Sequence, residues 1–136
     1  MRSVQVLTVS LPLLYAGTAA LYALSYAGER TPAWSQTARR VLLLATIAAH
    51  VGLFGLHAQT HGAFPIQGAA LTISGVALTT AILFRLVSLR VPQPTVGTLV
   101  LTAVALLQWA AAAFGPASAS EAAPAKNGAA VLHIVV

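Results

Sequence analysis

Long runs of apolar residues, separated by short polar links, dominate the pattern along this chain. A helix rises about 1.5 Å per residue, so about twenty residues cross the hydrocarbon core of a bilayer. Four runs approach or exceed that length, and we expect helices at about residues 4–27, 41–58, 66–87 and 96–114. The predicted fold is an all-α membrane protein, a single transmembrane helical domain that covers residues 1–136.

A further apolar run ends the chain. It covers residues 129–136 and follows a loop rich in small and polar residues, much as the earlier runs follow their links. So short a run cannot cross a bilayer. We therefore expect the start of a fifth helix and interpret the chain as the N-terminal part of a longer protein. An apolar tail that rests in the membrane interface is the alternative.

Composition narrows the chemistry. Hydrophobic residues make up 58% of the chain and charged residues 7%, against about 25% charged in an average globular protein. The chain has no cysteine, which excludes disulfides, thiol chemistry and covalent haem attachment through this chain. Glu29 and Glu121 are its only carboxylates and lie in different links, so we predict no acid/base pair and no catalytic residue.

The arginines indicate topology. Arg30, Arg39 and Arg40 lie between the first two runs, and Arg85 and Arg90 flank the end of the third. The positive-inside rule places these links in the cytoplasm and the N-terminus outside. The net charge of +5 therefore predicts orientation in the membrane, not nucleic-acid binding. A cleaved signal peptide is an alternative for the first run, which is longer than the usual 7–15 apolar residues of such signals.

Among the candidate functional residues, His50 stands out because it lies in the middle of the second apolar run. An ionisable side chain at that depth is costly and marks a candidate functional site. The structural alternative is a neutral imidazole that bonds to a Thr or Ser of a neighbouring helix. His57 and His61 have the i, i+4 spacing of a metal-binding pair. Gly62 and Pro65 follow at once and suggest that the helix ends before His61, and no third ligand is near, so this metal prediction is weak and solvated interfacial histidines are the alternative.

Several segments together resemble the N-terminal half of the cytochrome c assembly protein family, the CcsA/ResC and HemX/YpjD-like membrane proteins. The matching patterns are LPLLYAGTAALYALS, then RRVLLLATIAAHVGLFGL with His50, then FPIQGAALTISGVALTTAILF, and finally LHIVV with His133. The resemblance covers essentially the whole chain in order and spacing. The tryptophan-rich segment of that family would lie beyond Val136, and neither Trp34 nor Trp109 belongs to such a motif.

This resemblance implies a haem-handling component of cytochrome c maturation in the bacterial inner membrane. It implies haem b as cofactor, His50 and His133 as axial ligands, and presentation of haem to apocytochrome c on the outer side, together with other maturation proteins. A membrane scaffold or regulatory subunit that binds no haem is the main alternative, and a small permease subunit is another.

Four glycines and Arg85 each allow two interpretations. Gly52, Gly55, Gly68 and Gly75 either leave room for a flat ligand or allow close packing of membrane helices, and packing is the favoured interpretation. Arg85 is expected to extend to the cytoplasmic headgroups, with a haem propionate as the other candidate partner.

Overall fold

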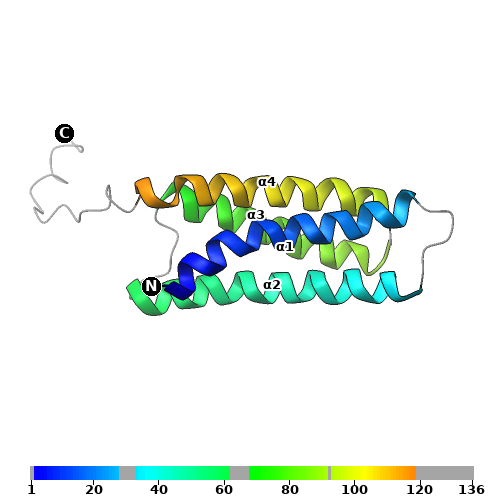
Figure 1. Ribbon diagram of the computed structural model, residues 1–136, viewed down its shortest axis with the longest axis horizontal. Helices are drawn as coiled ribbons and strands as arrows, with labels where there is room; N and C mark the ends of the chain where they lie inside the picture. The colour runs from blue at the N-terminus through cyan, green and yellow to red at the C-terminus, as the bar shows by residue number, and fades with distance from the viewer. Residues whose placement is uncertain (1, 28–32, 62–67, 92, 119–136) are drawn as a thin grey trace, which may run out of the picture.

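Four helices make up the part of the chain that the computed structural model describes, residues 2–27, 33–61, 68–91 and 93–118. The helices are α1 (Arg2–Ala27), α2 (Ala33–His61), α3 (Ala69–Ser88) and α4 (Pro94–Ser118). Consecutive helices run in opposite directions along a common long axis (Figure 1). No strand occurs among the described residues, and the predicted all-α class with four membrane-spanning helices is confirmed. Residues 129–136, the expected start of a fifth helix, lie outside the described ranges.

The second helix is longer than expected at both ends. It begins at Ala33, so Trp34, Arg39 and Arg40 lie on the helix and not in a link, and it continues through His61. The apolar run marks the part of a helix that suits the bilayer core, whereas polar residues such as Gln and Arg are good helix formers that extend it. The third helix begins at Ala69 instead of residue 66, and Pro65 lies outside the described residues.

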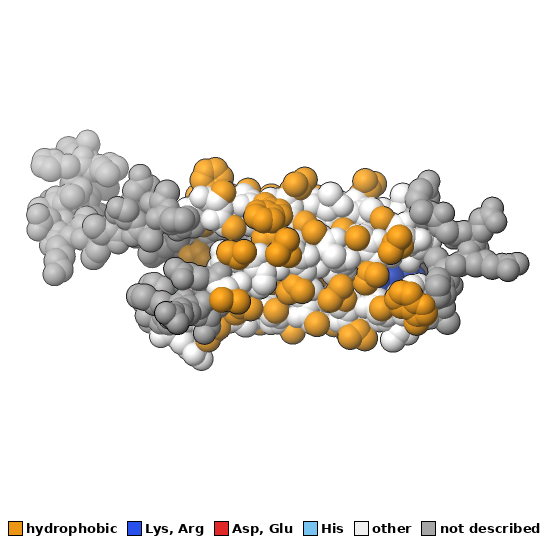
Figure 2. Space-filling model, in the orientation of Figure 1, with side chains coloured by type: hydrophobic (Ala, Val, Ile, Leu, Met, Phe, Trp, Pro, Cys, Tyr) orange, Lys and Arg blue, Asp and Glu red, His pale blue; other side chains and the backbone are white. Residues whose placement is uncertain are grey.

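The outer surface of the bundle is apolar. Each helix contains a stretch long and apolar enough to cross a membrane, from 20 to 26 residues. Large apolar side chains such as Leu24, Leu83 and Leu99 are more than half exposed, and hydrophobic side chains cover the face drawn in Figure 2. An exposed apolar surface of this extent is unfavourable in water and suits lipid. The protein is therefore a membrane protein.

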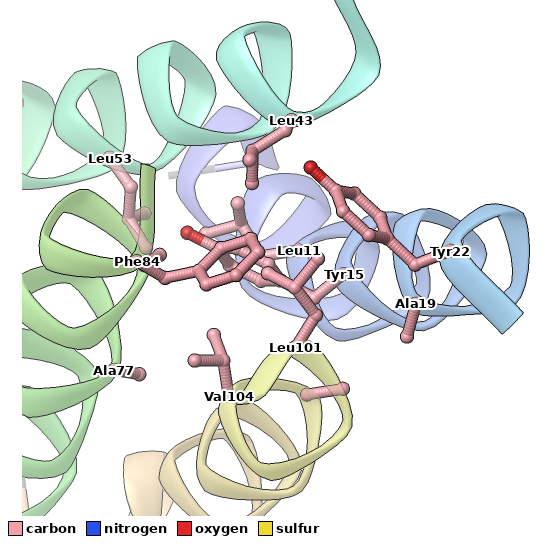
Figure 3. Close-up of a cluster of buried hydrophobic side chains, with 12 residues drawn as sticks. Leu11, Tyr15, Ala19, Tyr22, Leu43, Leu53, Ala77, Phe84, Leu101 and Val104 are labelled. Atoms are coloured by element: carbon pink, nitrogen blue, oxygen red, sulfur yellow. The ribbon is translucent and has the colours of Figure 1, made fainter. Parts of the chain in front are cut away.

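Side chains from all four helices meet in the bundle core (Figure 3). Helix α4 packs extensively against α1 and α3, and α1 packs against α2, whereas the interface between α2 and α3 is the smallest. The core cluster consists of Leu11, Tyr15, Ala19, Tyr22, Leu43, Leu53, Ala77, Ala81, Phe84, Leu101, Val104 and Ala105.

Helix α4 packs tightly against two side chains of other helices at Gly97. The rings of Tyr22 and Phe84 meet there edge to face, with their centroids 5.6 Å apart. A Cβ atom on Gly97 would lie 2.9 Å from Cζ of Phe84 and closer still to the Tyr22 ring. Glycine is needed at this position because any side chain would displace one of the two rings.

The glycines singled out from the sequence behave differently. A Cβ on Gly52 or Gly55 would meet no described atom within 4 Å, so the expected close packing is wrong at these two positions. Gly75 makes an ordinary contact, since a Cβ at that position would lie 3.9 Å from Cζ of Phe54. Gly68 precedes α3 with a φ of 104°, a conformation that glycine adopts without strain.

Candidate functional site

His50 is fully buried on α2, at the point where the four helices converge. Its ring stacks on Phe54 of the same helix, with centroids 5.7 Å apart and an interplanar angle of 27°. The ring of Tyr15 approaches it edge-on, with centroids 5.8 Å apart. Aromatic groups on α1 and α2 therefore fix the plane of the imidazole from two directions.

Hydrogen bonds then link His50 to each of the other helices. The hydroxyl of Tyr15 on α1 lies 3.0 Å from Nδ1, and the hydroxyl of Ser74 on α3 lies 2.9 Å from Nε2. The side-chain amide of Gln108 on α4 is 2.8 Å from Nε2 of His50 and 3.0 Å from Oγ of Ser74. We call these four residues the His50 cluster; each helix contributes one of them, and all four are buried.

The geometry assigns the proton on the imidazole. The amide nitrogen of Gln108 carries two hydrogens and no lone pair available to accept, so it donates to Nε2 of His50 and to Oγ of Ser74. Because Nε2 must then accept, the proton of the neutral imidazole is on Nδ1. Nδ1–H donates to the hydroxyl oxygen of Tyr15. No buried side-chain nitrogen or oxygen of the described residues lacks a hydrogen-bond partner.

The sequence pointed to part of this arrangement. The alternative in which His50 bonds to a Ser or Thr of a neighbouring helix is confirmed by Ser74. Tyr15 and Gln108 were missed. A usable signal was present for Gln108, which is an isolated amide in the apolar interior of α4. Tyr15 is one of several hydroxyl-bearing residues of α1, and nothing local distinguishes it from the others. Such groups need partners inside a membrane, and the four helices could have been aligned by that requirement.

The cluster does not provide a haem site in the described arrangement. Both ring nitrogens of His50 are engaged, and its ring is enclosed by side chains. A groove of about 300 Å³ lies on another part of the bundle, between α1 and α4, and is lined mainly by alanines together with Trp109. Haem ligation needs an open cleft beside the ligating nitrogen. The residues around His50 therefore do not fit haem as they stand.

Three further histidines were predicted as ligands, and of these only His57 has a described side chain. His57 and His61 both lie on α2, so the expectation that the helix ends before His61 is wrong, and the two residues keep i, i+4 spacing on a continuous helix. The side chain of His61 and all of His133 lie outside what the structure describes. Among the described side chains, no group of three His, Cys, Asp or Glu residues could hold a metal ion. The predictions for these histidines stay predictions.

Comparison of the chain with protein-family models, curated proteins and solved structures finds no match. The resemblance to cytochrome c assembly proteins therefore stays a prediction, carried by the residue patterns quoted above.

Proposed function

We propose that this chain is a membrane scaffold component of cytochrome c maturation, in which His50 fixes the arrangement of the helices and does not carry haem. One observation supports the scaffold role above others. The buried imidazole uses both ring nitrogens for hydrogen bonds to side chains of three other helices. Because both ring nitrogens are already hydrogen-bonded, neither is free to bind haem iron in this arrangement.

A polar cluster suits a scaffold because van der Waals packing alone specifies helix register weakly in lipid. Lipid chains are as apolar as the helix surfaces, so hydrogen bonds between helices add specificity that apolar contacts lack. The smallest interface in the bundle, α2 against α3, is also the one joined by the His50–Ser74 hydrogen bond of 2.9 Å. The cluster supports that interface where packing contributes least.

The assignment to cytochrome c maturation rests on the resemblance in order and spacing, from the LPLLYAGTAALYALS pattern to LHIVV. The same resemblance supports the bacterial inner membrane as the location of the protein. It also supports apocytochrome c and the other maturation proteins as partners. The arginines at one end of the bundle support a cytoplasmic position for that end and an external N-terminus.

Haem handling is the second candidate, and the proton position favours it. With the proton on Nδ1, the lone pair of His50 is on Nε2, the form of imidazole that ligates a metal. A hydrogen bond from the other ring nitrogen, here to Tyr15, is the usual support of a metal-binding histidine. Gln108 and Ser74 would have to move away from Nε2 before it could bind iron.

Absorption spectroscopy separates the two candidates. The full chain is purified from haem-replete cells, and a second sample is titrated with haemin. The scaffold role predicts no Soret band that depends on His50. A band in the wild type that is lost in His50→Ala, but kept in the lipid-facing control Val51→Ala, would overturn the scaffold role in favour of haem handling. Circular dichroism of each variant verifies that the helices remain.

Cross-linking in cells tests the pathway. The chain is expected to cross-link to membrane proteins of cytochrome c maturation, and His50→Ala is expected to reduce this only as far as it lowers the amount of folded protein. Cross-links to unrelated membrane proteins alone would contradict the pathway assignment while leaving the His50 cluster intact as a structural feature.

A further inference from the structure

Arginines from two helices gather at the end of the bundle opposite the N-terminus. Arg39 and Arg40 come from the first turns of α2, and Arg85 comes from the last turn of α3. Together they line a cavity of about 30 Å³, which we call the arginine pocket. On the face drawn in Figure 2, arginine side chains are visible at this end. Its other lining residues are Tyr22, Ser88, Gln93 and Pro94.

The arginines of the pocket outnumber the acidic side chains of the sequence. The whole sequence has two acidic residues, whereas the pocket alone holds three arginines. Even if both acidic side chains paired with these arginines, one guanidinium would remain without an acidic side chain of this sequence. Within the described part of the pocket, Arg39 interacts with the Tyr22 ring, whose centroid lies 5.1 Å from Cζ of the arginine. That contact orients the guanidinium but does not neutralise it.

The pocket is also built to keep its positive character. The hydroxyl of Ser88 donates to the carbonyl oxygen of Arg85 at 2.8 Å, which satisfies one of the free carbonyl groups in the last turn of α3. Helix α4 begins at Pro94 in the pocket wall. The first turn of a helix carries N–H groups without partners in the helix and the positive end of its dipole. The N-terminus of α4 favours an anion, whereas the last turn of α3, which also lines the pocket, carries the negative end of its helix dipole. The full positive charges of the three arginines outweigh these partial charges and favour an anion.

Size and place narrow the class of anion. A cavity of about 30 Å³ is too small for a whole lipid headgroup, so the pocket admits only the outermost oxygens of a ligand whose remainder lies outside. One guanidinium group can donate two parallel N–H hydrogen bonds to two oxygens of the same phosphate. The pocket lies at the ends of four membrane-spanning helices, where lipid headgroups are found. Basic pockets between such helices bind anionic headgroups.

We propose that the arginine pocket binds the phosphate group of an anionic membrane lipid. Arg39 and Arg85 are the principal contacts because both are half-buried in the pocket wall, whereas Arg40 is more exposed. This inference is independent of the role of His50 and of any haem binding. It requires only that the four described helices form the bundle seen here.

A lipid titration tests the proposal. The full chain in a neutral detergent is titrated with short-chain phosphatidylglycerol and, separately, with phosphatidylcholine, and bound lipid is counted by native mass spectrometry. We expect tighter binding of phosphatidylglycerol. Arg39→Gln and Arg85→Gln are each expected to weaken it about fivefold, the effect of about 1 kcal/mol per arginine near a membrane surface. Arg90→Gln is the matched control, since Arg90 is exposed at the same end and does not line the pocket.

Each outcome decides for or against the pocket. Equal weakening by Arg90→Gln would mean that binding follows general surface charge, and would overturn the proposal. Equal binding of both lipids would overturn it too. Inorganic phosphate is added as a competitor; if it displaces phosphatidylglycerol at equal concentration, the site takes free phosphate and the lipid assignment is wrong. If a glutamine variant does not fold, Arg85→Lys replaces it and is expected to keep preference for phosphatidylglycerol.

Discussion

The His50 cluster and the arginine pocket are both polar regions of an apolar bundle, but they differ in how their polar groups are satisfied. The His50 cluster is neutral, buried and closed by hydrogen bonds among its own members. The arginine pocket is positively charged, lies at the end of the bundle and contains more arginines than the sequence has acidic side chains.

Because of this difference, we assign a structural role to the His50 cluster and a binding role to the arginine pocket. A buried polar group costs free energy unless it is hydrogen-bonded, and the cluster avoids that cost without any outside molecule. The arginines reach the water and headgroup region, where a charge is tolerated without a protein partner and stays available to a ligand. A histidine deep in a membrane helix is the first candidate for a binding site. Among the described residues, however, the arginines of the pocket are charged groups that have no carboxylate partner.

Removal of the imidazole is expected to have the largest effect. His50→Ala would leave a cavity and would deprive Tyr15, Ser74 and Gln108 of a shared partner. We expect a loss of about 2–4 kcal/mol in the free energy of unfolding, measured by reversible denaturation in mixed detergent micelles. Val51→Ala, at a neighbouring position that is 50% exposed, is the control and should cost less than about 1 kcal/mol. Equal losses would mean that the cluster contributes nothing beyond helix packing.

Gly97→Ala comes next and tests whether the arginine end depends on close packing as well as on charge. The new methyl would press on the rings of Tyr22 and Phe84, so we expect a loss of about 1–3 kcal/mol in the same unfolding measurement. Gly52→Ala is the matched control. It faces open space and should be neutral or stabilising by up to about 1 kcal/mol, because alanine favours helix. A neutral Gly97→Ala would contradict the close approach.

The smallest effect is expected from single hydroxyl removal in the cluster. Tyr15→Phe removes the acceptor of the Nδ1–H bond and should cost about 0.5–1.5 kcal/mol. Thr79→Ala is the control, because its hydroxyl donates to the carbonyl oxygen of Gly75 in its own helix at 2.9 Å and joins no helices.

The proton position assigned to the same ring can be measured directly. Nuclear magnetic resonance of the chain labelled with ¹⁵N-histidine should find the His50 proton on Nδ1 in the wild type. A proton on Nε2 would contradict the assigned hydrogen bonds and would mean that the Gln108 amide presents its oxygen to His50.

Much of the fold was predictable because each helix carries its own signal. Four apolar runs of membrane-spanning length predicted four helices, and His50 was recognised as exceptional from its neighbours in sequence alone. Helix bounds were less predictable: α2 starts at Ala33, well before its apolar run, because hydrophobicity reports lipid contact and not helix formation. The glycine that matters, Gly97, could not be distinguished from Gly52 because nothing local encodes which ring will face it.

The sequence by itself determined that this is a helical membrane protein with arginines concentrated near one end and an ionisable residue in an apolar helix. Hydrophobicity and helix length depend on residues that are close together along the chain, so no tertiary contact is needed to read them. The tertiary structure alone decided that Tyr15, Ser74 and Gln108 meet His50, and that Arg39 and Arg85 share a pocket. These groups come from different helices, and their meeting depends on how the helices rotate and align against one another.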